Sequence, residues 1–208
     1  MTTTTLTKTA AQALLAHTQQ ATATITVGSA IDVSGKVGPA TALVKMGRTV
    51  STALTNEVKF RLEVSAKTSG TDEWVPLYEW SSANGKTAAS STTLNGATTA
   101  GNSTTVLTSG TGFTAGDLCY IRETGTPANS EWSRELSVST NTVTWEEAQT
   151  RNHTSGVACT DLAEMWAIQF DVSGQVRTRL IVDTASAASG QTVDVIAYLI
   201  TADSAGTV

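Results

Sequence analysis

The segment from residue 57 to residue 66 constrains the fold more than any other part of the chain. Apolar and charged side chains alternate along it, with Val58, Phe60, Leu62 and Val64 set between Glu57, Lys59, Arg61 and Glu63. A period of two places the apolar residues on one face of a strand and the charged residues on the other. We therefore expect a strand with one buried and one solvated face, which is typical of antiparallel sheets.

The same alternation returns in both halves of the chain. Further strands are predicted around Ile25–Val27, Ala40–Met46, Trp74–Trp80, Trp166–Val172, Val176–Val182 and Val193–Leu199. Pro76 lacks an amide donor, so it predicts that the strand containing it lies at a sheet edge or carries a bulge. Threonine, which favours strands and keeps an exposed sheet face soluble without charge, replaces much of the usual charged content, which is only 15% here.

Residues 7–20 are the one stretch that predicts a helix. Ala10, Ala13 and Leu14 share a thin apolar face, and a helix this short needs a surface to lie on. That surface is either the protein's own sheet or a neighbouring subunit. In the second case Leu14 and Leu15 are candidate interface residues.

The middle of the chain differs from the two ends in composition and in the length of its predicted strands. Residues 81–102 are rich in Ser, Thr, Ala, Gly and Asn and predict a connection, whereas residues 103–160 contain shorter strands with closer turns. We expect an all-β protein: an antiparallel, jelly-roll-like sandwich with an inserted small β-barrel or meander and a short N-terminal helix or arm. The predicted division is an arm at 1–20, a sandwich at 21–90 and 161–208, and the inserted domain at 91–160.

Composition excludes several classes of partner. A net charge of −5 without a Lys/Arg cluster argues against nucleic acid, and no apolar run approaches the length of a membrane span. The first residues lack the basic and apolar regions of a secretory signal, so we expect folding in the cytoplasm. In that compartment Cys119 and Cys159 are predicted to be reduced, buried thiols.

The sequence offers no constellation typical of catalysis. Only two histidines are present: His17 is interpreted as a surface or interface side chain, and His153 as a turn-capping or packing residue. A metal site from Cys119, Cys159 and His153 lacks ligand spacing, and the glycines from 110 to 116 lack the pattern of a phosphate loop. We expect no enzyme, no metal and no cofactor.

The tryptophans are the remaining candidates for recognition. Trp74, Trp80 and Trp132 could stack on sugar rings or anchor a subunit interface, although most of the five tryptophans are expected in the core or at interfaces.

The middle segment resembles a small β module found in structural proteins of tailed phages. The module has a Gly-x-Phe-x-x-Gly-Asp turn, a hydrophobic strand, a strand with Glu and Val, an Asn-Thr-hydrophobic-Thr element and a late His-x-x-Gly-Val. The matching residues are Gly112-Phe113 (glycine directly precedes the phenylalanine), Gly116-Asp117, Tyr120-Ile121, Glu131, Leu136-Ser137-Val138, Asn141-Thr142-Val143-Thr144 and His153 with Gly156-Val157. The flanking halves resemble phage virion sandwiches more diffusely, through Met46–Thr49 and Phe60–Ser65.

This resemblance implies a virion protein assembled in the host cytoplasm, and it carries over no catalytic residue. The leading hypothesis is a capsid decoration (cement) protein that binds the major capsid protein or other virion proteins and self-associates, most simply as a trimer. A ring-forming neck or tail protein and a carbohydrate-binding β-sandwich module are the alternatives. No nucleic acid or membrane is expected as a partner.

Overall fold

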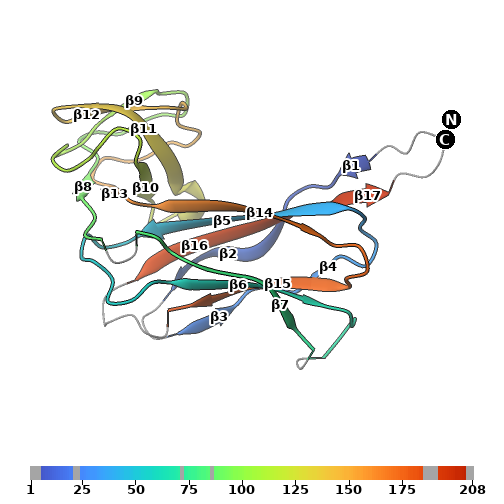
Figure 1. Ribbon diagram of the computed structural model, residues 1–208. Helices are drawn as coiled ribbons and strands as arrows, with labels where there is room; N and C mark the ends of the chain where they lie inside the picture. Colours follow the sequence, from blue (N-terminus) through green and yellow to red (C-terminus); the bar gives the residue numbers. More distant parts are fainter. Residues whose placement is uncertain (1–5, 21–23, 71–72, 85–86, 185–191, 205–208) are drawn as a thin grey trace.

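The computed structural model describes residues 6–20, 24–70, 73–84, 87–184 and 192–204, and within these ranges the protein is built from antiparallel β-sheets (Figure 1). The first layer of the sandwich is a four-stranded sheet in the order β14-β5-β16-β2. Its strands are β2 (Gln12–Gln20), β5 (Pro39–Arg48), β14 (Glu164–Asp171) and β16 (Val193–Ile200). The all-β antiparallel sandwich expected from the sequence is confirmed.

The second layer is a five-stranded sheet in the order β3-β15-β6-β7, with the short β4 also paired to β15. Its strands are β3 (Ile25–Val27), β4 (Ile31–Asp32), β6 (Lys59–Ser65), β7 (Val75–Ser81) and β15 (Arg177–Asp183). β7 lies at the sheet edge, and its pairing with β6 shifts register beside Pro76. The expectation that Pro76 lies at a sheet edge or a bulge is confirmed, and a residue without an amide donor is tolerated at such a position.

The core between the layers is made by the alternating residues that the sequence singles out. Phe60 and Leu62 from β6 meet Val44 from β5 and Val195 from β16, and each is 1% exposed or less. One departure is Glu63, which belongs to the outward row of β6 but is only 3% exposed. The outward faces of the sandwich are therefore not uniformly solvated.

The predicted helix over residues 7–20 is wrong: Gln12–Gln20 form the strand β2, paired with β16. The register between the two strands shifts twice, each time inserting one extra residue into β2. These bulges let the consecutive residues Leu14 and Leu15 both enter the core, at 0% and 6% exposure. Two adjacent buried residues break the period of two, which is why the alternation did not reveal this strand.

Residues 91–160 form a third, six-stranded sheet in the order β8-β13-β10-β11-β12-β9. The strands are β8 (Ser91–Thr93), β9 (Thr104–Val106), β10 (Leu118–Arg122), β11 (Glu131–Ser139), β12 (Thr142–Trp145) and β13 (Ala158–Thr160), with a 3-10 helix, η1, at Pro127–Asn129. A bridge between Leu94 and Leu107 joins the two edge strands, so the sheet curls into a small barrel. We call this unit the barrel.

The barrel has a core of its own. Phe113, Ile121, Val143 and Trp145 pack inside it with both cysteines. Cys119 and Cys159 are free and buried, as expected from the sequence. The Cys119 thiol donates a hydrogen bond to Glu135 Oε1 over 2.6 Å, and burial raises the pKa of the Glu135 carboxyl to about 7.

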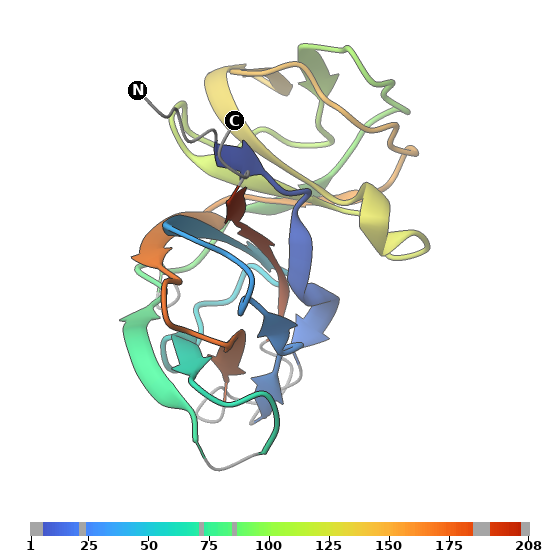
Figure 2. The ribbon, with the colours of Figure 1, turned by 90° about the vertical axis from the view of Figure 1, so that its right-hand side faces the viewer.

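A two-stranded ribbon of β1 (Leu6–Lys8) and β17 (Ala202–Ser204) continues past the end of the sandwich opposite the barrel (Figure 1). Viewed from that end, the ribbon stands above the four-stranded sheet, on the same side as the barrel (Figure 2). Lys36 holds it in place through a bridge and a 2.5 Å ion pair with Asp203. The outer face of the four-stranded sheet is thus bounded by the barrel at one end and by the ribbon at the other.

Candidate binding cleft between the sandwich and the barrel

The barrel is docked onto the four-stranded sheet by Tyr120 of β10. Its ring lies directly against Gly47 of β5, where an added Cβ would come within 2.2 Å of Tyr120 Cγ. Real Cβ atoms do not approach a ring carbon that closely, so only glycine leaves room for the ring. Gly47 therefore provides the point on β5 against which the barrel packs through Tyr120.

A buried polar network fixes the orientation of this contact. The Tyr120 hydroxyl donates to Asp194 Oδ2 over 2.6 Å, and Arg122 Nε donates to the same oxygen over 2.8 Å. His17 Nε2 lies 2.9 Å from the Tyr120 hydroxyl oxygen, to which it donates when the tyrosine proton is directed at Asp194. Burial lowers the pKa of His17 and raises the pKa of Tyr120, so both side chains are held in their neutral forms near pH 7.

The chain segment that enters the barrel is anchored as well. Arg48 is fully buried and donates to the main-chain carbonyls of Asn84 and Thr87. The Glu164 carboxylate accepts the main-chain N–H groups of Ala83 and Asn84 over 2.8 and 2.9 Å. These charge-assisted bonds hold Ala83, Asn84 and Thr87, the described residues on either side of 85–86, against the sandwich.

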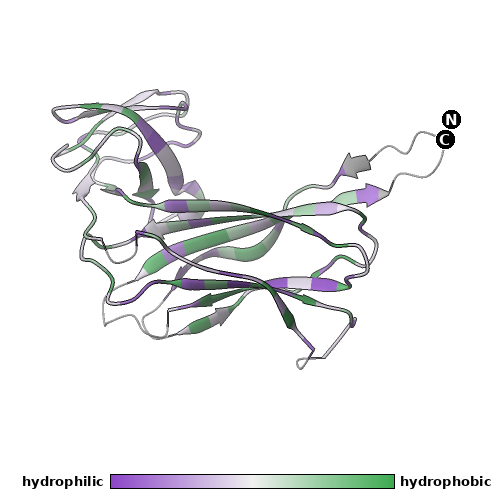
Figure 3. Ribbon diagram, in the orientation of Figure 1, coloured by the Kyte–Doolittle hydropathy of each residue, from purple (hydrophilic) through white to green (hydrophobic). Residues whose placement is uncertain are grey.

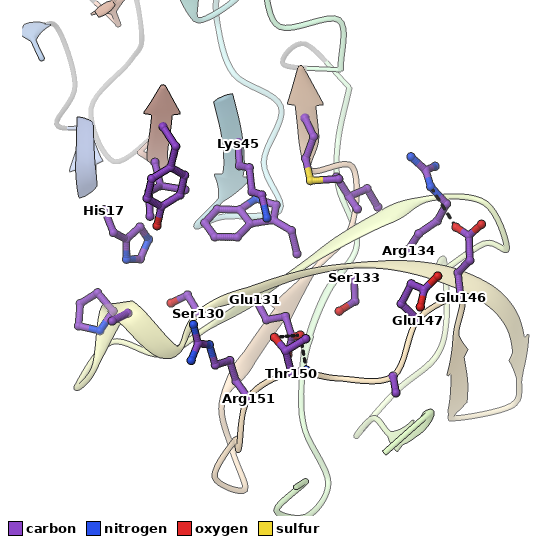
Figure 4. Close-up of a pocket in the computed structure, with 18 of the residues that line it drawn as sticks. His17, Lys45, Ser130, Glu131, Ser133, Arg134, Glu146, Glu147, Thr150 and Arg151 are labelled. Atoms are coloured by element: carbon purple, nitrogen blue, oxygen red, sulfur yellow. Dashed lines mark hydrogen bonds and ion pairs between the residues drawn. The ribbon is translucent and has the colours of Figure 1, made fainter. Parts of the chain in front are cut away.

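A cleft of about 810 Å³ opens beside this junction (Figure 4). One wall is the outer face of the four-stranded sheet, from which Lys45 points toward the barrel. The opposite wall comes from β11 and the loop at 146–151, with Ser133, Glu147 and Arg151 among its residues. The cleft therefore presents groups of both charges, from segments far apart in the sequence.

Several charges of the cleft are already engaged within the protein. Glu131 accepts hydrogen bonds from the main-chain N–H and hydroxyl of Thr150, at 2.7 and 2.8 Å, and its Oε2 lies 3.0 Å from His153 Nε2. Burial alone would raise the pKa of Glu131, but the bonds from His153 and Thr150 outweigh it and lower the pKa. Burial also lowers the pKa of Lys45, with Glu131 opposing that effect.

Trp132, one of the candidate recognition residues, acts as part of the junction. Its ring centroid lies 4.5 Å from that of Tyr120 and 5.9 Å from that of His17, and Lys45 Nζ is 5.7 Å from it. Groups of the protein therefore surround much of the ring. Its Nε1 is buried with no hydrogen-bond partner among the described residues. This arrangement is typical of a packing residue rather than of an open platform for a sugar.

The other predicted interface residues do not share one surface. Trp80 stacks on Phe60 with ring centroids 5.4 Å apart at the edge of the core, and Leu14 and Leu15 are core residues of β2. Of these residues, only Trp74 lies on an outer face, that of the five-stranded sheet. The guanidinium carbons of Arg179 and Arg177 lie 4.1 and 4.8 Å from the centroid of its ring.

Both histidines are enclosed by other parts of the protein. His153 is 2% exposed and bonded to Glu131, which agrees with a packing role. His17, interpreted as a surface or interface side chain, instead lies within the junction between barrel and sandwich, because the segment is a strand of the sheet rather than a helix. Among the residues that the structure describes, no group of three or more His, Cys, Asp or Glu side chains is placed to hold a metal.

Sequence reasoning missed the residues that build the junction: Tyr120, Asp194, Arg122 and Gly47. The available signal was Gly47 itself, a glycine inside an otherwise alternating strand, which often marks close approach of another segment. No local sequence pattern indicated that its partner is Tyr120, which lies 73 positions later in the chain.

Comparisons with family models, curated proteins and solved structures returned no match to this chain. In the described part of the chain, no helix combines the length and apolarity needed to cross a membrane.

Proposed function

We propose that the protein is a non-enzymatic structural component of a tailed-phage particle, and that it is a capsid decoration protein. It would bind the major capsid protein at subunit junctions and strengthen the shell through buried area. The virion is then its final location, after assembly in the host cytoplasm.

The observation that carries this proposal is the barrel. Residues 91–160, which contain the phage-like sequence elements, fold as a six-stranded unit with its own core and a fixed seat on the sandwich. A reinforcing part must transmit strain between the subunits it joins, and two units joined by close packing and buried hydrogen bonds suit that task. The cleft beside the junction adds surface of mixed charge for contact with a neighbour.

The proposal is tested by adding purified protein to shells of a matching phage that lack it, and then sedimenting the particles. We expect saturable binding and a rise in the temperature or denaturant concentration at which the shells open. Absence of binding at every salt concentration tried would contradict the proposal. Rings of the isolated protein seen by electron microscopy would move the assignment to the neck or tail.

A carbohydrate-binding role is the second candidate, and Trp74 favours it. The ring is half-buried and backed by two guanidinium groups, which hold it in place as a flat apolar platform. Tryptophan fluorescence is expected to change on addition of one member of a glycan panel, and the change should vanish in Trp74→Ala but persist in Trp132→Phe. A spectrum unchanged across the panel would rule this role out.

A further inference from the structure

The geometry points to the outer face of the four-stranded sheet as a docking surface for a second copy of this chain. The inference goes beyond the proposed function, because the pairing concerns the free protein and requires no shell.

The surface is a grid of side chains set by the strand register. Met165, Lys45 and Ile196 form the row nearest the barrel, because each lies opposite the next on β14, β5 and β16. The second row is Ala167, Leu43, Tyr198 and Ala13, and the third is Gln169, Thr41 and Ile200. We call these ten residues the outer grid.

The outer grid is nearly free of charge. Lys45 is its one charged residue, and it lies at the barrel end with its amine over Trp132. Leu43, Ile196, Tyr198 and Ile200 are only partly buried, and Met165 is 45% exposed. Figure 3 shows β16 largely in the colours of apolar residues, whereas β6 and β15 of the other layer carry hydrophilic ones. A contiguous sheet face that is largely apolar indicates a contact surface.

Charge favours a second copy as the occupant. The whole chain carries a net charge of −5, so two copies repel each other overall. The outer grid contains no acidic residue, so apposing two grids brings no acidic groups of the grid together, and the single Lys45 of each lies at one end. A twofold pair buries the same apolar patch on both partners, which is the usual form of a homodimer contact.

The shape of the face restricts how two copies can pack. The barrel and the β1–β17 ribbon rise on the same side at opposite ends of the sheet (Figures 1 and 2). If the strands of two copies ran along each other, these raised ends would collide. Crossing the sheets at a large angle avoids the collision, since each copy then lies between the barrel and ribbon of the other. Near-perpendicular crossing is one of the two usual geometries for packed sheets.

The experiment is light scattering coupled to size-exclusion chromatography at rising protein concentrations. We expect a mass approaching twice the 21.6 kDa of the monomer. Tyr198→Lys and Leu43→Lys, which alter cross-strand neighbours at the centre of the outer grid, should each return the monomer. Val27→Lys is the matched control, because Val27 is 55% exposed on the other layer and its variant should remain paired.

Circular dichroism melting of each variant separates loss of pairing from loss of folding, and the two grid variants provide independent trials. A wild-type monomer at all concentrations overturns the inference, as does a pair that survives both substitutions in folded protein. A mass of three copies would support the trimer that the phage resemblance implies and would also overturn the twofold pair. None of these results depends on shell binding, which tests the proposed function separately.

Discussion

The two outer faces of the sandwich are built by the same alternation and yet differ sharply in chemistry. The outer grid has one charged residue among ten. The outer face of the five-stranded sheet carries Lys59, Arg61, Glu63, Arg177, Arg179 and Asp183 on just two neighbouring strands. The inward residues of both layers form the core, whereas the outward residues set the polarity of each outer face.

On the charged face the charges are organised around Glu63. Its carboxylate is buried and lies 2.6 Å from the Nε atoms of both Arg61 and Arg179. Trp74 covers Arg179 and Arg177 from above. Both carboxylate oxygens of Glu63 are thus paired within this face, whereas the outer grid carries no acidic residue.

The largest effect is expected where the apolar face supports the barrel. Gly47→Ala places a methyl group inside the Tyr120 ring and should lower the free energy of unfolding by about 3 kcal/mol, as overpacking of a well-filled site does. Urea denaturation measures the loss. Gly35→Ala is the control, because nothing lies within 4 Å of its Cβ position. Equal stability of the two variants would mean that Tyr120 does not depend on Gly47.

The next largest effect is expected from removing the buried carboxylate of the charged face. Glu63→Ala leaves Arg61 and Arg179 without their shared carboxylate and should cost about 2 kcal/mol, less than a fully buried pair because Arg61 remains partly solvated. Lys45→Met on the outer grid removes a charge that makes no hydrogen bond or ion pair within 4 Å in the described structure, and should change stability by less than about 0.5 kcal/mol. The comparison between the faces fails if the two substitutions are equivalent by chemical denaturation.

A smaller effect is expected from the aromatic cover of the charged face. Trp74→Ala removes the ring that lies over Arg177 and Arg179 and should lower the free energy of unfolding by about 1 kcal/mol. Because the partners are cations, Trp74→Leu should recover the apolar contact but not the whole loss. Full recovery by leucine would show that the ring contributes packing alone.

The smallest expected effect is the contribution of His17, which lies at the barrel end of the four-stranded sheet, to the pH dependence of stability. Burial lowers the pKa of His17 in the folded state, so below pH 6.5 the unfolded chain binds a proton that the folded protein resists. The contribution of His17 to stability should therefore fall as the pH drops from 7.5 to 5.5, whereas the raised pKa of Glu135 acts in the opposite direction and is common to wild type and variant. Wild type should lose more stability, or gain less, than His17→Gln over the same interval. Parallel pH profiles would contradict this assignment.

The fold was predictable where side chains obey the period of two. The strands containing Val44, Phe60, Leu180 and Val195 bury the residues that the alternation indicates. β2 was not predictable in this way, because its two bulges bring Leu14 and Leu15 into the core together. A short Ala- and Leu-rich segment that breaks the period is indistinguishable from a weak helix by local pattern alone.

The candidate site was largely beyond sequence reasoning. Tyr120 belongs to a hydrophobic strand and has no local mark of a junction residue, and its partner Asp194 is 74 positions away. Trp132 was singled out for its ring, but the contacts that enclose it come from His17 and Lys45 on other strands. Such contacts arise only when the barrel has docked, so they are properties of the tertiary structure.

The pairing of β1 with β17 also determines how the molecule responds to mechanical force. A tension applied to both strands at their outer ends, Leu6 and Ser204, would open the ribbon one hydrogen-bonded pair at a time, like a zipper. The barrel begins and ends within the interior of the chain, at neighbouring points where β8 and β13 pair, and lies outside that path. Stretching would therefore peel the ribbon back toward the Lys36–Asp203 ion pair before any tension reached the barrel.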